Sequence, residues 1–200
     1  MEGRLSFAVR PLIRNLTALL EGERAIKYSE DRLHISTWLP PVPGEAFDRY
    51  SKAQLSSLFG KPIPDQVTIA ITEECPNFCR HCALPNTKSK SMLSLGEIED
   101  AIDQVLALGT TLVIFDGGEP TTYQDLASAI ARVDRNKAIS TLFTSGYGFT
   151  AEKARELNQS GLYAVNVSLD FPDEKRHDKM RGREGVFSEA IAAIGNAREA

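Results

Sequence analysis

The sequence lacks the features that would direct a chain to membranes or nucleic acid. No apolar run in its 200 residues approaches the roughly 20 that a membrane-spanning helix needs. Arg10, Pro11 and Arg14 interrupt the apolar residues near the start, so this stretch does not resemble a secretory signal peptide. A formal net charge of −4 gives no general attraction for nucleic acid. We therefore expect neither nucleic acid nor a membrane among its partners.

Cysteine is scarce, and the three cysteines that are present lie together. Cys75, Cys79 and Cys82 are spaced C-x3-C-x2-C. An odd number of thiols in so tight a loop excludes a disulfide framework. Thiolates bind soft metals, and cysteine is the usual ligand of iron–sulfur clusters. A cubane normally takes four cysteines, so three would leave one iron open to a small molecule. Clustered reduced thiols also favour a cytoplasmic location.

Composition and patterning predict a globular α/β protein. Hydrophobic residues make up 42% and charged residues 25% of the chain, and its length suits one or two domains. From Val67 onward, short apolar runs alternate with amphipathic helices, as in a parallel sheet. Expected strands cover residues 67–72, 111–115, 139–144 and 163–169. Expected helices cover residues 94–108, 122–135, 150–159 and 186 to the end.

The first part of the chain has a different character. Residues 1–62 predict a mostly helical N-terminal extension, and residues 63–200 predict a core domain. Within the extension we expect a helix over residues 5–20, a hairpin within residues 27–38 and a helix over residues 45–59.

Four motifs follow the four expected strands. They are Cys75–Cys82, Gly117–Pro120, Thr144–Gly146 and Ser168–Asp170. In parallel α/β barrels, functional groups gather at the carboxyl ends of strands. The placement of all four motifs at such ends predicts a single site.

The same residues resemble the motifs of the radical S-adenosylmethionine (SAM) superfamily. The cysteine loop, with His81 before its last cysteine, resembles that family's cluster loop. Gly117–Pro120 is similar to its GGEP motif, and Thr144–Gly146 stands where the family often has T-N-G. Val167–Asp170 and the H-D-x-x-R-G stretch His177–Gly182 are similar to further motifs of branches with C-terminal auxiliary clusters. The matches keep the family's order over about residues 67–187.

The resemblance implies a fold and a chemistry. The fold would be a partial (β/α)6 TIM-like barrel, of which only four βα units are recognisable here. The last expected helix is still running at Ala200, so we expect the sequence to be the N-terminal part of a longer protein. Cys75, Cys79 and Cys82 would hold a 4Fe–4S cluster whose fourth iron binds SAM. An electron from a donor such as flavodoxin or ferredoxin would cleave SAM to a 5′-deoxyadenosyl radical, which attacks the substrate.

The resemblance also implies a set of SAM contacts. The backbone at Gly117–Gly118 would approach the SAM amino group, with Glu119 ordering that end of the site. Ser168 would contact the SAM carboxylate or ribose, with Asp170 orienting it, and Arg181 would suit a bidentate contact with a carboxylate. Ser145 replaces the usual asparagine and cannot supply an amide contact. The full set implied is His81, Gly117, Gly118, Glu119, Thr144, Ser145, Ser168, Asp170 and Arg181.

Simpler explanations of single motifs remain open. The cysteines could form a zinc site completed by His81 or His177, or an iron–sulfur module for electron transfer or structure that never meets SAM. Glu119 could cap a helix N-terminus in a tight turn. Asp178 and Arg181 could be an ion pair in a loop, with His177 structural.

The substrate is less well defined by the sequence. The H-D-x-x-R-G stretch resembles enzymes that modify peptides or tetrapyrrole precursors. In the molybdenum-cofactor cyclase branch, arginines that grip a triphosphate occupy the positions of Thr68 and Ile114. Their replacement argues against a nucleoside triphosphate. The expected substrate is therefore a peptide, a tetrapyrrole or another cofactor precursor.

Overall fold

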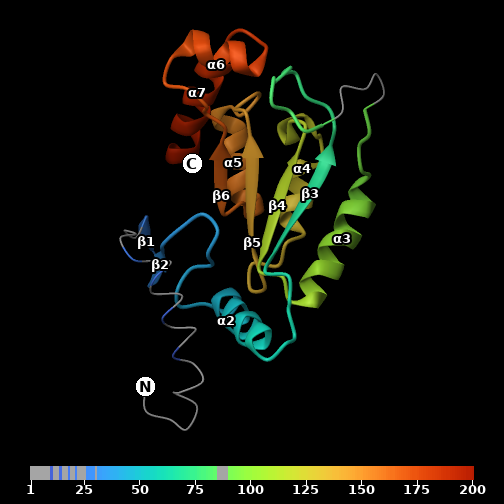
Figure 1. Ribbon diagram of the computed structural model, residues 1–200, viewed down its shortest axis with the longest axis vertical. Coiled ribbons are helices and arrows are strands. Elements are labelled where there is room, and N and C mark those ends of the chain that lie inside the picture. The colour runs from blue at the N-terminus through green and yellow to red at the C-terminus, as the bar shows by residue number, and fades with distance from the viewer. Residues whose placement is uncertain are drawn as a thin grey trace.

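A four-stranded parallel sheet forms the centre of the computed structural model (Figure 1), which describes residues 26–29, 31–84 and 90–200 and the single positions 10, 14, 18 and 21. The strands lie in the order β3-β4-β5-β6. Thr68 of β3 pairs with Ile114 of β4, which pairs with Thr141 of β5. Thr144 of β5 lies opposite Val167 of β6. The strands are β3 (Gln66–Thr72), β4 (Leu112–Gly117), β5 (Ile139–Thr144) and β6 (Ala164–Val167).

Helices cover one face of the sheet, and the hydrophobic core lies between them. Ile71, Phe115 and Leu142 of the sheet are fully buried in this core. The opposite face is more open: Thr68 and Phe143 on it are exposed. The helices are α3 (Leu95–Leu108), α4 (Leu126–Ala131), α5 (Ala151–Ser160) and α7 (Val186–Glu199), with α6 (Glu174–Arg181) at the end of the molecule where the strands finish (Figure 1). The predicted α/β partial barrel with four βα units is therefore confirmed.

Local sequence signals explain the helix ends. Glu97 accepts a hydrogen bond from the Ser94 amide (2.7 Å), and its own amide donates to the Ser94 hydroxyl (3.3 Å), which completes the predicted capping box of α3. Gly109 ends that helix in the left-handed conformation. Thr150 caps α5, as expected.

Two expected elements differ from the structure. The helix expected over residues 122–135 is only Leu126–Ala131, preceded by a 3-10 turn at Pro120–Thr122, because Glu119 caps the chain three residues earlier. The H-D-x-x-R-G stretch, treated as a loop, forms α6. Asp173 caps this helix, but its single buried side chain leaves no apolar stripe for periodicity to detect.

The N-terminal extension contains the predicted hairpin and helix. The hairpin joins β1 (Lys27–Ser29) to β2 (Arg32–His34), and α2 spans Glu45–Leu58. The helix expected over residues 5–20 lies outside the described residues, apart from positions 10, 14 and 18. In the part of the chain that the structure describes, no helix is long and apolar enough to cross a membrane.

Tyr163 joins this extension to the sheet. Its hydroxyl donates to the carbonyl oxygens of Ser36 (3.2 Å) and Leu39 (3.3 Å), and its ring stacks on His34. Nearby, Arg49 of α2 donates to the Leu106 carbonyl at the end of α3 (2.6 Å). The extension is therefore tied to the end of the sheet opposite to the four motifs.

We predict that Tyr163→Phe lowers the stability of the fold. Burial raises the pKa of Tyr163 to about 12, so its contribution is complete below pH ~10 and is lost as the pH rises through ~12. Removing the hydroxyl leaves two carbonyls without their donor and should cost about 1 kcal/mol in thermal unfolding at pH 8. An absorbance titration of tyrosinate should also lose its latest phase.

Tyr28→Phe is the matched control, because that phenol is exposed and, among the described residues, bonds Asp31 alone. Equal unfolding temperatures for Tyr163→Phe and Tyr28→Phe would show that the Tyr163 hydroxyl does not stabilise the fold.

Candidate functional site

The four motifs meet in one cavity of about 360 Å³ at the carboxyl ends of the strands. Ten of the twelve residues named from the sequence line it; the exceptions are Glu119, which is buried, and Asp170. Asn77, Asp116 and Phe143 also line the cavity but were not identified from the sequence. Val113 and Phe115 of β4 are fully buried under the helices, so alternation along that strand would have placed Asp116 on the open side. The predicted residues that line the cavity are Cys75, Cys79, His81, Cys82, Gly117, Gly118, Thr144, Ser145, Ser168 and Arg181.

The cysteine loop leaves the end of β3 and turns back on itself. A hydrogen bond from the Glu74 amide to the Thr72 hydroxyl (3.0 Å) fixes the turn at the start of the loop. A second, from the Cys82 amide to the Cys79 carbonyl (3.2 Å), fixes the turn between these two cysteines. Burial raises the pKa of the Cys75 thiol, while a hydrogen bond from the Asn77 backbone acts in the opposite direction. All three cysteines are free.

The thiols share a cavity without converging on one point. Among the described residues, no three His, Cys, Asp or Glu side chains are placed to hold a metal ion. Zinc needs its sulfur ligands within about 2.3 Å of the ion. An iron–sulfur cluster takes one thiolate per iron, so its ligands stand farther apart. Three free thiols in one cavity match the number that a cluster with one open iron takes.

Asn77 adds a donor to this set. Its side chain lies among the three cysteines and is only 8% exposed. Arg183 donates to its Oδ1 (2.8 Å), which turns the amide Nδ2 away from that arginine. Nδ2 is buried and has no hydrogen-bond partner among the described residues. A buried N–H without a partner is costly, and cluster sulfur is an acceptor of the right kind, so the residues present fit an iron–sulfur group.

The glycine turn after β4 packs directly against the cysteine loop. The Gly118 amide donates to the Thr72 carbonyl (2.6 Å), and the Glu119 amide donates to the Glu74 carbonyl (2.7 Å). A Cβ added to Gly118 would overlap the backbone of Glu74. The glycine is needed first for this approach of two chain segments, and a substitution there would move the cysteine loop as well as the cavity wall.

Glu119 lies beneath the cavity with 1% of its surface exposed. One carboxylate oxygen accepts hydrogen bonds from the hydroxyls of Thr144 (2.6 Å) and Thr121 (2.9 Å). The other accepts from the amide (2.8 Å) and hydroxyl (2.5 Å) of Ser145. The carboxylate therefore joins the end of β4 to the end of β5. Ser145, which stands where the family often has asparagine, donates to Glu119.

The H-D-x-x-R-G motif folds over the same end of the sheet. Arg181 Nε lies 2.8 Å from Asp170 Oδ2. Asp178, which the sequence paired with Arg181, instead accepts from the amides of Gly185 (2.7 Å) and Phe187 (2.9 Å) at the start of α7. The Asp178–Arg181 pair that the sequence left open is not formed, because Asp178 bonds the start of α7 and Arg181 contacts Asp170 instead.

His177 is fully buried and has a structural environment. Its Nδ1 accepts a hydrogen bond from the Asp170 amide (3.2 Å), and its ring meets Phe187 edge-on. Burial lowers the pKa of His177, and Arg181 lowers it further, against the opposing effect of Asp170 and Asp178. The structural alternative for His177 is favoured.

The end of α6 is hydrogen-bonded to the cysteine loop. The Phe78 amide donates to the Arg181 carbonyl (2.9 Å), and the Arg80 amide donates to the Met180 carbonyl (3.0 Å). Gly182 ends α6 at φ +72°, where a Cβ would overlap the Phe78 carbonyl oxygen. The Phe78 side chain itself is exposed, so only its backbone joins the loop to α6.

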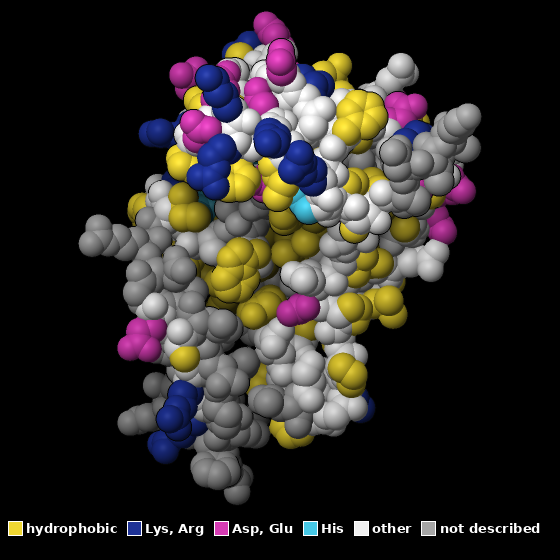
Figure 2. All heavy atoms as spheres, turned by 45° about the horizontal axis from the view of Figure 1, so that its top comes forward, with side chains coloured by type: hydrophobic (Ala, Val, Ile, Leu, Met, Phe, Trp, Pro, Cys, Tyr) yellow, Lys and Arg dark blue, Asp and Glu magenta, His cyan; other side chains and the backbone are white. Residues whose placement is uncertain are grey.

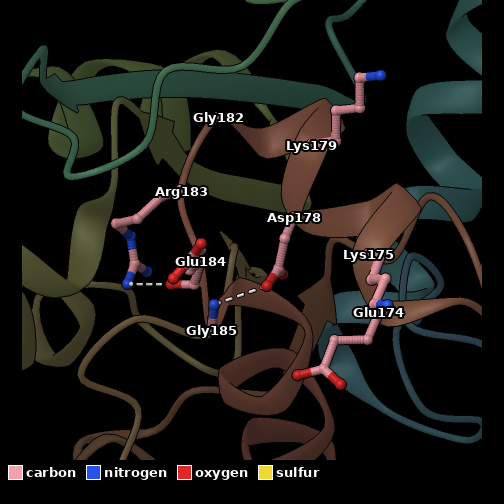
Figure 3. Close-up of a pocket in the computed structure, with 8 residues that line it drawn as sticks. All are labelled: Glu174, Lys175, Asp178, Lys179, Gly182, Arg183, Glu184 and Gly185. Atoms are coloured by element: carbon pink, nitrogen blue, oxygen red, sulfur yellow. Dashed lines mark hydrogen bonds between the residues drawn. The ribbon is translucent and has the colours of Figure 1, made fainter.

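A larger open cleft of about 770 Å³ lies between α6 and the turn that leads from it to α7 (Figure 3). Its lining mixes Lys175 and Lys179 with Glu174 and Glu184, and it contains no cysteine. Figure 2 shows the charged side chains gathered at this end of the molecule, with apolar side chains in the hollow below. The mixed charge favours no single ligand, so the smaller cavity with the thiols is the candidate site.

Comparisons with known proteins agree with this geometry. The Radical SAM superfamily matches residues 69–200. An Fe-coproporphyrin III synthase of Methanosarcina barkeri is 32% identical over 163 residues, which cover 80% of this chain and 41% of that protein. An AdoMet-dependent heme synthase of the same organism is 31% identical, covering 68% of this chain and 40% of that protein. The crystal structure of Streptococcus suis SuiB bound to precursor peptide SuiA has a TM-score of 0.61 at 19% identity, covering 98% of this chain and 43% of that one.

The chain belongs to the radical SAM superfamily. Enzymes of this family use a 4Fe–4S cluster and SAM, so the predicted cofactors are confirmed at the level of the family. The chain spans about 40% of the length of the curated relatives that it matches.

Replacing Glu119 by glutamine should destabilise the site. The N–H₂ group of the glutamine would face hydroxyl and amide groups that donate to the carboxylate in wild type. At least one buried hydrogen bond is then lost, which lowers the free energy of unfolding by about 1–3 kcal/mol. At about 2–4 °C per kcal/mol, the fall in thermal unfolding temperature is measurable by circular dichroism.

Glu156→Gln serves as the control, because that carboxylate makes an exposed pair with Lys153 and should change stability by less than about 1 kcal/mol. If the two variants unfold at the same temperature, Glu119 does not hold the strand ends together.

His177 should make stability depend on pH in a defined direction. Its pKa is lowered in the fold, so its contribution is complete above the unfolded value of about 6.5 and is lost as the pH falls through the folded value. His177→Asn keeps an acceptor for the Asp170 amide but does not titrate. The stability difference between wild type and variant should shrink between pH 8 and pH 5 in urea unfolding. A difference that is constant or grows toward pH 5 would contradict this assignment.

Proposed function

We propose that the whole protein is a radical SAM enzyme that binds its 4Fe–4S cluster through Cys75, Cys79 and Cys82 and begins radical chemistry on a tetrapyrrole precursor. The observation that carries the proposal is the single cavity where three free thiols meet the ends of β4, β5 and β6. An electron-transfer module would need the thiols but not the Ser168 hydroxyl beside them.

Particular residues are suited to hold SAM in that cavity. The backbone at Gly117 and Gly118 forms part of the wall and suits the amino group. The Ser168 hydroxyl also lines the cavity and has no hydrogen-bond partner among the described residues, which leaves it for the ribose or carboxylate. Thr144 and Ser145 bond Glu119 and act by keeping the wall in place. The bound cluster would supply the electron that cleaves SAM to an organic radical.

The substrate class rests on two observations. Curated relatives at 31–32% identity are named for iron-coproporphyrin and heme synthesis. The open face of the sheet carries Thr68, Ile114 and Phe143, and none of the four strands contains Lys or Arg. Such a face offers no cation to a triphosphate and suits a broad, largely apolar ring. The likeness to a peptide-bound enzyme is one of fold, so a peptide is the second candidate.

The domain division and the reductant complete the proposal. Residues 1–62 act as an extension, of which the described segment 31–62 is tied to the end of the sheet away from the site, and residues 63–200 form the core, in line with a family match that begins at residue 69. A flavodoxin or ferredoxin serves as the electron donor, because the cluster must be reduced before SAM is cleaved.

Electron paramagnetic resonance (EPR) tests the proposal. The protein is reconstituted anaerobically with iron and sulfide, reduced, and measured with and without SAM. We expect a reduced 4Fe–4S signal that changes shape when SAM is added, since SAM binds the iron that lacks a cysteine. The Cys79→Ala variant should lose this signal, although it keeps Cys75 and Cys82 and should still fold.

Two results would overturn the proposal. A cluster signal indifferent to SAM would identify an electron-transfer or structural module. A protein that binds zinc and assembles no cluster would remove the radical chemistry altogether.

A further inference from the structure

Arg181 places a guanidinium group against one of the three cysteines. Its Nη1 lies 3.8 Å from Cys79 Sγ, and its side chain is 11% exposed. It also lines the cavity that contains the thiols. A cation at this distance from sulfur, and largely out of water, interacts with it more strongly than an exposed one would.

The position of Arg181 is fixed from two sides. Its guanidinium contacts both carboxylate oxygens of Asp170, at 2.8 and 3.1 Å. Asp170 is in turn held by its amide's hydrogen bond to the buried His177 (3.2 Å). The Arg181 carbonyl accepts from the Phe78 amide, one residue before Cys79. The guanidinium and the thiol therefore belong to one hydrogen-bonded unit.

Binding the carboxylate of a ligand does not fit this geometry as the main role of Arg181. The fork that would grip a ligand already contacts Asp170, so binding would have to replace an existing ion pair. The contact with sulfur needs no such exchange. Asp170 contacts Arg181, and Arg181 in turn contacts Cys79, so the three side chains form a line of polar contacts that ends at the thiolate.

We propose that Arg181 sets the reduction potential of the cluster by hydrogen-bonding the Cys79 thiolate, with Asp170 positioning the guanidinium and moderating its charge. The inference rests on the proposed function, because it requires a cluster on the three cysteines. Reduction adds one electron to the cluster, and a cation or N–H donor at a ligand sulfur stabilises the more negative state. Arg181 thereby makes the cluster easier to reduce, and Asp170 opposes it.

The two charges predict shifts of opposite sign. Arg181→Gln keeps a side chain of similar reach without the charge and should lower the equilibrium constant for reduction about tenfold, which is 59 mV for a one-electron couple. Asp170→Asn leaves the arginine uncompensated and should raise the constant, by about threefold because the carboxylate acts on the sulfur through the arginine and is partly exposed. Arg181→Lys retains a charge and should lie between Arg181→Gln and wild type.

The measurement is an EPR-monitored redox titration of each reconstituted protein in the absence of SAM. Lys179→Gln is the matched control: it removes an exposed cation from the same helix, two residues from Arg181. Its midpoint should equal that of wild type.

Each outcome decides the inference. Opposite shifts for Arg181→Gln and Asp170→Asn support it; if the glutamine variant assembles no cluster, a midpoint of Arg181→Lys below that of wild type supports it instead. Midpoints equal to wild type in Arg181→Gln overturn it, and so does loss of the cluster in both Arg181 variants, which would assign the fork to loop folding. If wild type itself assembles no cluster, the proposed function fails; if wild type assembles one that responds to SAM and only the midpoints fail to move, the inference alone fails.

Discussion

The hydrogen bonds of the buried Glu119 carboxylate are the constraint on which the site depends. The carboxylate joins the end of β4 to Thr144 and Ser145 at the end of β5, directly beneath the cavity. The same turn is bonded through Gly118 and Glu119 to the start of the cysteine loop. One buried anion thus fixes the relative positions of three chain segments that are far apart in sequence.

A second layer of contacts holds the cysteine loop from the other side. The end of α6 bonds the loop through main-chain groups, and Arg183 bonds Asn77 within it. Arg183 is itself held by an ion pair with Glu189 of α7. The loop is therefore enclosed between the sheet ends and the α6–α7 corner, which leaves the thiols facing a defined space before any cofactor binds.

The sequence predicted well what depends on local patterns and poorly what depends on distant partners. Period-two and period-3.6 patterning located the strands and α3, and the Ser94–Glu97 capping box was correct to the residue. The three cysteines and the glycine turn were identified because their spacing carries the chemistry. Helix α6 was missed because it is polar on almost every side, and its stability comes from caps at Asp173 and Gly182. The partner of Arg181 was also missed, since only the fold brings Asp170 to it.

Mössbauer spectroscopy of protein reconstituted with ⁵⁷Fe would show whether one iron of the cluster lacks a cysteine ligand and binds SAM. Three cysteines and a cavity beside them predict that about one quarter of the iron absorption changes its parameters when SAM is added, while the rest stays tetrahedral and sulfur-bound. Iron sites that all remain unchanged by SAM would contradict the account, because the cavity beside Cys75, Cys79 and Cys82 would then not bring SAM to the cluster.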